Sequence, residues 1–502
     1  MLARFNYLFR STKGLVLVAI ALIALVTAIW GTLSGPMVEW GVRDVTVRAL
    51  GMQLHPAERE GRIIMLYHTI AMAVVAIEVY LITHLVPMKP HEPGIINGTI
   101  TFGYISSMVF GLAFAYFGHH FVFHGLFLFG QSLVFFAGLL LAVALWPWRE
   151  AYHIRDPRYA HAGRIDLERT AFFVMAVATL GSALFGAVTG SYWGNGHETF
   201  LAEDLIREPH KTPLQLAIIG HLHIMLTLIA VALALIIGRW FDYQGPLHKL
   251  SMPLMIAGTV IITLGVWSVV PFEPFAHTII YVGSVLILLA ALFLVIYGFR
   301  KIIHDRLAEQ GIQQASFWQG LGALLHDPLR FGSLWQMVYM NFTVSGVGIF
   351  MAVKLDEIFR VWPAREERIA LTGHWHILSG IIATIILLYY ADMAGLKGRI
   401  RQWFGWLVII GSDIAFGAVT VFEMKRLFVS ESAQQPLVNW TMALADLGLA
   451  LVLTVLAVLM VWRLLDLFKR QGRWQVEFEE TALPDVGSEM ADRLPPAREV
   501  AS

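Results

Sequence analysis

Long apolar runs are the feature of this sequence that most limits what it can fold into. Of the 502 residues, 57% are hydrophobic and only 14% are charged, and the mean hydropathy is +0.66. Soluble domains carry a charge on about a quarter of their residues. A helix needs about 20 apolar residues to cross a hydrocarbon core of roughly 30 Å. We therefore expect an all-α protein that spans a membrane many times.

Twelve segments have the length and hydropathy of a membrane-spanning helix. They cover approximately residues 15–34, 62–86, 97–117, 123–146, 170–190, 214–238, 251–270, 276–298, 335–353, 369–391, 404–422 and 438–463. An even number of spans places both termini on one side, and the excess of Lys and Arg in the terminal and even-numbered connections predicts that this side is cytoplasmic. The expected location is a bacterial cytoplasmic membrane. The first span lacks a convincing cleavage site after it, so we expect it to be retained.

The last part of the chain differs in composition from the spans. Residues 1–465 are expected to form the membrane domain and residues 466–502 a cytoplasmic tail. From Gln471 onward the chain is acidic, and it has few large apolar residues after Phe478. This composition predicts a disordered extension.

Cysteine is absent, which excludes several kinds of chemistry. Without it the chain has no disulfide, thiolate metal site, iron–sulfur cluster, covalent c-type haem or thiol nucleophile. The 36 basic residues balance the 36 acidic ones, so nothing favours nucleic acid as a partner. Any metal must be held by nitrogen or oxygen, and 19 histidines are present to supply nitrogen.

Histidines recur at one depth near the outer ends of spans two, six and ten. These are His68, then His221 and His223, then His374 and His376. The surrounding segments read Leu-Tyr-His-Thr at 66–69, Gly-His-Leu-His-Ile-Met at 220–225 and Gly-His-Trp-His-Ile-Leu at 373–378. Their separation is about 150 residues, or four spans, which predicts three pseudo-repeats of four helices.

The doubled histidines of span ten point to cofactor binding. Residues two apart on a helix are about 200° apart, so His374 and His376 are expected on opposite faces, where one helix could ligate two cofactors. A buried imidazole needs a polar partner, and a pair hydrogen-bonded in a polar cavity is the plainer alternative. Without sulfur, the commonest membrane-embedded solution is haem iron with axial imidazoles.

Twelve spans, histidines in spans two and six, and His-x-His in span ten resemble the central subunit of haem-copper oxidases. The nearest branches are the cbb-type oxidases and nitric oxide reductases, and the resemblance covers essentially residues 1–465. It implies a low-spin haem b between His68 and His376, and a second haem b on His374. It also implies that Lys425 and Arg426, after span eleven, contact haem propionates.

The chain departs from that family where a copper or non-haem iron would be bound. Family members carry a His-His pair near the outer end of span seven, whereas residues 267–277 read Trp-Ser-Val-Val-Pro-Phe-Glu-Pro-Phe-Ala-His. Only Glu273 and His277 could replace the pair as ligands or catalytic groups, and Pro274 makes a regular helical face there doubtful. We do not expect a standard copper centre. Non-haem iron with histidine and carboxylate ligands stays open.

Span six leaves two alternatives for the second haem. If His221 or His223 ligates the iron carried by His374, that haem is saturated and can only pass electrons. If the histidine stays farther away, a five-coordinate haem could reduce a small molecule.

Three acidic residues lie inside apolar runs, where a charge costs at least ~2.5 kcal/mol. Glu78 in span two, Asp413 in span eleven and Asp446 in span twelve are therefore candidates for a proton pathway. Glu78 could take protons from the cytoplasmic side, and Asp446 could hydrogen-bond an imidazole. The alternative for each is a neutral acid with a structural hydrogen bond.

A further group of histidines lies outside the apolar cores. His119, His120 and His124, between spans three and four, are either surface polar residues or a docking point for a periplasmic electron carrier. His197 and His210 are expected in a loop.

Three functions follow from these features. The first is a b-haem redox subunit of a larger membrane complex, which exchanges electrons with a periplasmic cytochrome or similar carrier and, in one version, with quinone. The second is a terminal oxidase or nitric oxide reductase with an altered metal site. The third is a proton-coupled transporter. Whether the chain is an enzyme stays open.

Overall fold

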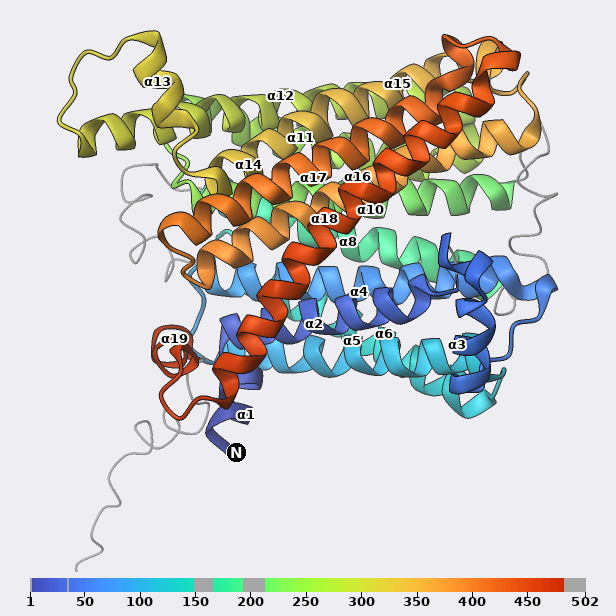
Figure 1. Ribbon diagram of the computed structural model, residues 1–502, viewed down its shortest axis with the longest axis horizontal. Helices are drawn as coiled ribbons and strands as arrows, with labels where there is room; N and C mark the ends of the chain where they lie inside the picture. The colour runs from blue at the N-terminus through green and yellow to red at the C-terminus, as the bar shows by residue number, and fades with distance from the viewer. Residues whose placement is uncertain (1, 34–35, 149–165, 193–212, 483–502) are drawn as a thin grey trace, which may run out of the picture. The chain divides into compact units, whose positions relative to one another are not determined.

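The computed structural model describes residues 2–33, 36–148, 166–192 and 213–482, and these form helices joined by short connections (Figure 1). Contacts divide the chain into two compact units. The first unit contains residues Met1–Glu203 and Asp466–Ser502, and the second contains Asp204–Leu465. Each unit is described by itself.

The first unit contains five long helices and several short ones. In chain order they are α1 (Leu2–Arg10), α2 (Thr12–Gly31), η1 (Pro36–Trp40), α3 (Val42–Leu50), η2 (Pro56–Glu58), α4 (Arg59–Leu85), α5 (His91–Phe117), α6 (Phe121–Ala144), α8 (Leu167–Tyr192) and, from the C-terminal part, α19 (Arg473–Thr481).

The second unit contains the remaining long helices, and it includes one π-helix within span nine and a second just after that span. Its elements are α10 (Pro213–Trp240), α11 (Gly245–Trp267), α12 (Val269–Glu309), α13 (Phe317–Leu324), α14 (Pro328–Val338), the π-helix η3 (Tyr339–Val344), α15 (Ser345–Val353), the π-helix η4 (Leu355–Phe359), α16 (Ala364–Met393), α17 (Gly398–Met424), η5 (Lys425–Leu427), η6 (Glu431–Ala433) and α18 (Gln434–Phe468).

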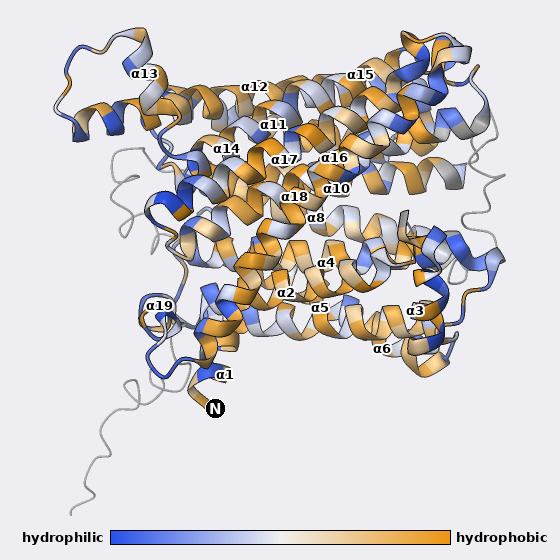
Figure 2. Ribbon diagram, viewed as in Figure 1, coloured by the Kyte–Doolittle hydropathy of each residue, from blue (hydrophilic) through white to orange (hydrophobic). Residues whose placement is uncertain are grey.

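Within the described residues, twelve helices are long and apolar enough to cross a membrane. Hydrophobic residues follow these helices, whereas hydrophilic residues gather at short elements such as α3 and α19 (Figure 2). The predicted all-α fold with twelve spans is confirmed. The contacts define two units and not three groups of four helices, so the threefold repeat stays a prediction.

Helix α19 lies in the segment that the composition predicts to be disordered. The Asp466 carboxylate accepts hydrogen bonds from the backbone N–H groups of Arg473 and Trp474, each at 3.1 Å, which satisfies the first turn of α19. Trp474 is only 5% exposed, and its ring lies 6.1 Å from that of Tyr7. The structure therefore differs from the expectation for residues 473–481, while residues 483–502 lie outside the described part.

Polar contacts join α19 to the start of the chain. The Tyr7 hydroxyl donates to Glu477 Oε2 at 2.7 Å, and both residues are buried. Lys13 donates to Glu480 at 2.8 Å, and this bond lowers the pKa of Glu480 below its ordinary value of 4.5. A lowered carboxyl pKa contributes stability above that ordinary value and loses it as the pH falls. The Glu480 side chain is exposed, so the contribution of the pair is small.

Close packing in the second unit places α17 against both α14 and α16. A Cβ on Gly332 of α14 would lie 2.8 Å from Ile409 of α17, and a Cβ on Gly380 of α16 would lie 2.7 Å from Phe416. Glycine at these two positions lets the helices approach closely. The face of α17 that contains Phe416 therefore lies between two other spans.

The contact between α1–α2 and the C-terminal segment can be tested by a disulfide, because the chain has no other cysteine. Ser11 and Ala482 form an isolated antiparallel bridge. Such pairs have Cα atoms about 4.5–5.5 Å apart, within the range that a disulfide accepts. We expect Ser11→Cys combined with Ala482→Cys to cross-link on mild oxidation, as seen by loss of two reactive thiols. Ser11→Cys with Glu479→Cys is the control, and equal cross-linking of both pairs would contradict this contact.

Candidate functional site

Three of the histidines at the repeated positions share one side-chain arrangement. The Nδ1 atom of each faces the backbone carbonyl four residues earlier: His68 and Ile64 at 3.3 Å, His223 and Ile219 at 2.8 Å, and His376 and Thr372 at 2.8 Å. A carbonyl only accepts, so Nδ1 carries the proton and Nε2 carries the lone pair. Metal-ligating histidines are commonly held in this way, with the second nitrogen donating to a carbonyl.

These histidines belong to different parts of the fold. His68 lies on α4 in the first unit, and it is half-buried. His376 lies on α16 in the second unit, and its side chain is exposed although the helix is apolar. An exposed imidazole at membrane depth requires a polar or metallic partner.

The second unit brings His223, His374 and Trp375 together. The ring centroids of His223 and His374 are 6.2 Å apart, with their planes at 37°. The Trp375 indole N–H donates to His223 Nε2 at 3.0 Å. Both nitrogens of His223 are therefore engaged, one by a carbonyl and one by an indole. His221, two residues earlier on α10, is half-buried.

His374 differs from the other histidines in its surroundings. Its Nδ1 is buried and makes no hydrogen bond of standard geometry among the described residues, although the Ala370 carbonyl, four residues earlier, lies close to the ring. Gly348 of α15 lies beside the ring, because a Cβ at that position would be 3.5 Å from Cδ2 and 3.6 Å from Nε2. At this position α15 therefore presents no side chain to the Nε2 edge of His374.

The end of α17 lies beside the His374 turn. Glu423 is 2% exposed, and a Cβ on Gly373 would overlap its Oε2 atom. Just beyond it, Lys425 forms an ion pair with Glu366 and lies 4.7 Å from the Phe422 ring centroid. The predicted basic pair is thus on the same side of the second unit as His374 and His376. We call this side the His face.

Lys425 and Arg426 differ in how their charges are paired. The Lys425 charge is already neutralised by Glu366. Arg426 reaches Glu431 at 3.8 Å, and its Nε atom is buried without a hydrogen-bond partner among the described residues. Arg426 is therefore the better placed cation for an additional anion.

Glu273 and His277 follow a break in α12. Phe272 has non-helical backbone angles, φ −144° and ψ 55°, and Pro274 lies in the first turn after the break, where its missing N–H is tolerated. Both candidate ligands are half-buried. The His277 ring stacks on that of Tyr281, with ring centroids 6.5 Å apart. In the described ranges no three His, Asp or Glu side chains form a group that could hold a metal ion.

The three predicted intramembrane acids have different environments. Glu78 is 4% exposed, and its Oε1 atom has no partner within the described part of the chain. Asp413 accepts hydrogen bonds from Trp335 at 2.9 Å and from Gln336 at 3.0 Å. Asp446 is exposed on α18, and the structure contains no hydrogen bond from it to an imidazole among the described residues.

The histidines before α6 have local structural contacts. His120 accepts from the Val122 backbone at 3.3 Å and so caps α6. His119 lies 3.5 Å from Glu58, and the rings of His119 and His124 both lie against Phe114. These contacts support the plainer interpretation as surface polar residues. His197 and His210 lie outside the described residues.

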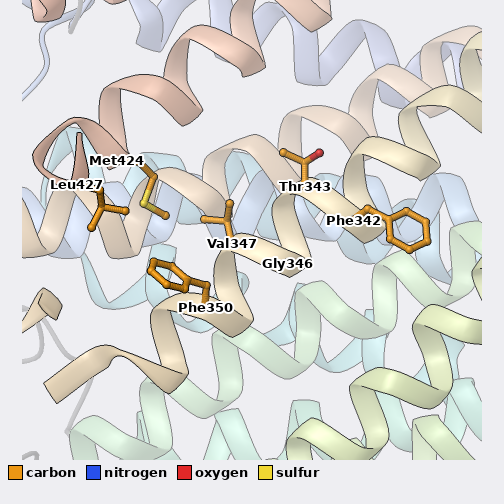
Figure 3. A pocket seen from close by; sticks show the side chains of 7 residues that line it. All are labelled: Phe342, Thr343, Gly346, Val347, Phe350, Met424 and Leu427. Atoms are coloured by element: carbon orange, nitrogen blue, oxygen red, sulfur yellow. The ribbon is translucent and has the colours of Figure 1, made fainter. Parts of the chain in front are cut away.

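A groove of about 450 Å³ runs along η3 and α15 to the end of α17 (Figure 3). Its lining residues are Phe342, Thr343, Gly346, Val347, Phe350, Met424 and Leu427. No histidine or acidic residue lines it, but its lining residues Val347 and Met424 are sequence neighbours of Gly348 and Glu423, which lie beside the His374 turn.

Three residues of the site region were not identified from the sequence. Trp375 is the spacer of His-x-His and carries no metal-binding signal of its own, and Gly348 lies in a glycine-rich apolar run without a motif. Glu423 stands next to the basic pair and resembles an interfacial residue. The sequence signal that could have identified Glu423 is its spacing from Asp413 and Thr420, because positions 413, 420 and 423 lie on one side of a helix.

The packing of Glu423 against the His374 turn gives a stability test. We expect Gly373→Ala to lower the free energy of unfolding by about 1–3 kcal/mol, because the added methyl displaces a buried carboxyl group. Gly417→Ala is the matched control, since nothing lies within 4 Å of its Cβ position. Thermal unfolding in detergent measures both. Adding Glu423→Ala to Gly373→Ala should recover stability, and a Gly373→Ala variant as stable as the control would contradict the contact.

No known protein family, curated protein or solved structure matches this chain.

Proposed function

We propose that this chain is a b-haem subunit of a bacterial cytoplasmic-membrane redox complex that exchanges electrons with a carrier on the outer face. The observation that carries the proposal is the common arrangement of His68, His223 and His376, with Nδ1–H held by a carbonyl and the lone pair on Nε2. A carbonyl-held imidazole at membrane depth is suited to axial ligation of iron.

His68 and His376 are the proposed ligands of the low-spin haem. Each ring is fixed by its own helix, so neither requires a partner residue to set its tautomer. Haem, when bound, supplies one-electron chemistry. The protein's own contribution is to hold each imidazole through Nδ1, which leaves the lone pair on Nε2.

His374 is the proposed ligand of a second haem. Its buried Nδ1 without a hydrogen bond and the glycine beside its Nε2 edge are features that fit a flat ligand at this ring. Arg426, whose Nε is buried without a partner among the described residues, is the proposed contact for a propionate. Lys425 would have to exchange Glu366 for the propionate.

The bond from Trp375 to His223 favours a second candidate function. With Nε2 of His223 engaged by the indole, His223 does not complete the coordination of an iron on His374 in this arrangement. A five-coordinate haem could bind a small gas, as in the oxidase or nitric oxide reductase alternative. That alternative also needs a second metal, for which Glu273 and His277 are the proposed ligands of non-haem iron.

The partners of this chain are proposed from its redox function. A periplasmic cytochrome or similar carrier would meet the His face, other subunits would complete the complex, and quinone is a further candidate donor. Both termini are proposed to be cytoplasmic.

Haem content tests the main proposal. We expect two haem b and no stoichiometric copper per purified chain, measured by pyridine haemochrome and metal analysis. His376→Ala should lower the count to one, because it removes an axial ligand. His326→Ala, at an exposed position between α13 and α14, is the matched control.

Colourless wild-type protein would reject the haem proposal and favour the proton-coupled transporter. Full haem retention in a combined His68→Ala and His376→Ala variant would reject the assigned ligands while leaving the redox function in place.

Carbon monoxide separates the two redox functions. Binding at one of the two haems, which the bond from Trp375 to His223 favours, would select the oxidase or nitric oxide reductase alternative over the proposed electron-transfer subunit. His374→Ala should abolish the response. A reduced spectrum that carbon monoxide does not change would mean that His221 or His223 completes the second haem, and the chain would then only transfer electrons.

A further inference from the structure

One face of α17 carries polar groups through the middle of an apolar span. Asp413 and Thr420 contact α14 and η3, and Glu423, farther along the same side of α17, packs against Gly373 of α16. Ten residues separate the two acids, which corresponds to about 15 Å along the helix. We call this strip, together with Gln336 and Tyr339 opposite it, the α14–α17 seam.

Asp413 lies at the inner end of the seam, where its two oxygens both accept hydrogen bonds. Trp335 Nε1 donates to Oδ2 at 2.9 Å and Gln336 Nε2 donates to Oδ1 at 3.0 Å. Gln336 also donates to Ser412 at 2.9 Å. A carboxyl group with an N–H donor on each oxygen is held as an acceptor, which suits a carboxylate.

Glu423 lies at the outer end of the seam, and unlike Asp413 it accepts no hydrogen bond from the described residues. It is 2% exposed, and neither oxygen has a hydrogen-bond partner among the described residues. An unpaired charge is strongly disfavoured at such a position, so the group is suited to be an uncharged acid with a proton to give. The nearby ammonium of Lys425 is paired with Glu366 instead.

A pair of hydroxyl groups lies between the two acids. Tyr339 Oη and Thr420 Oγ1 are 3.1 Å apart, and either can donate to the other. Tyr339 thus lies opposite the stretch of α17 between Asp413 and Glu423. It is also the first residue of the π-helix η3, a distortion found frequently at functional sites.

We propose that the α14–α17 seam is a proton relay that connects the His face to Asp413 in the middle of the bilayer. Glu423 passes its proton to the Tyr339–Thr420 pair and takes a replacement proton from the His face, so that it is not left charged. The hydroxyl pair accepts one proton as it gives up another, and the Asp413 carboxylate gains that proton. One Glu423 O–H bond breaks and another forms, the Asp413 O–H bond forms, and the hydroxyl pair is unchanged. Bound water or rotation of the carboxyl groups would cover the longer steps.

The relay does not depend on a bound haem. All of its groups lie in the second unit, and none is a proposed iron ligand. Glu78 lies in the first unit and Asp446 lies on the exposed face of α18, so neither belongs to the seam. The seam therefore distinguishes Asp413 from the other two predicted acids.

The test follows protonation of Asp413 by infrared spectroscopy after a rapid downward pH step, on the full chain in detergent. The carboxylic-acid band that is lost in Asp413→Asn is the reporter. We expect Tyr339→Phe, Thr420→Val and Glu423→Gln each to slow its appearance at least about tenfold, because each removes one hydrogen-bonding step. Thr420→Ser, which keeps the hydroxyl, should retain the wild-type rate.

Asp446→Asn and Tyr297→Phe are matched controls, since both lie off the seam, and they should leave the rate unchanged. Equal thermal unfolding midpoints exclude loss of structure as the cause. Wild-type rates in Tyr339→Phe and Glu423→Gln would overturn the relay, because protons from water would then reach Asp413 by another route. The absence of any Asp413 band that responds to pH would also overturn it. Neither outcome depends on haem content, so failure of the relay and failure of the proposed function are separate results.

Discussion

Polar groups placed in hydrocarbon must find their partners within the protein, and the rest of this structure depends on that constraint. It explains why the spans are helices, and why the histidines at membrane depth donate Nδ1–H to their own backbone. It also makes the exceptions informative. Glu78, Glu423 and Nδ1 of His374 are buried polar groups with unpartnered atoms in the described residues, and in a membrane such groups are generally functional.

Helix number and hydropathy could be predicted because the length of a span is set by the bilayer and not by neighbouring residues. The position of α19 could not be predicted in this way. Its sequence is acidic, and its order comes from Asp466 at its first turn and from Tyr7, more than 460 residues away. The composition of residues 473–481 shows only that the segment is acidic. The buried hydrogen bond between Tyr7 and Glu477 forms because a segment from the other end of the chain packs against α19.

The candidate site was partly predictable for a similar reason. The spacing of His374 and His376 placed them on different faces, but it could not reveal that Trp375 would donate to His223 on another helix. Asp413 stood out because it lies deep in an apolar run. Glu423 did not, because it precedes two basic residues, and only the packing of α17 on α16 shows that it points inward. Asp446 had the same sequence signal as Asp413 and proved exposed.

The π-helix at Tyr339–Val344 determines the directions in which the side chains after it in span nine point around the helix axis. A regular α-helix turns about 100° per residue, and a π turn accommodates one additional residue before the helix resumes. Tyr339 can therefore face α17 while Gly348 faces His374 on α16. A natural relative lacking one residue in this segment would lose that double alignment, so length here is constrained as tightly as side-chain identity.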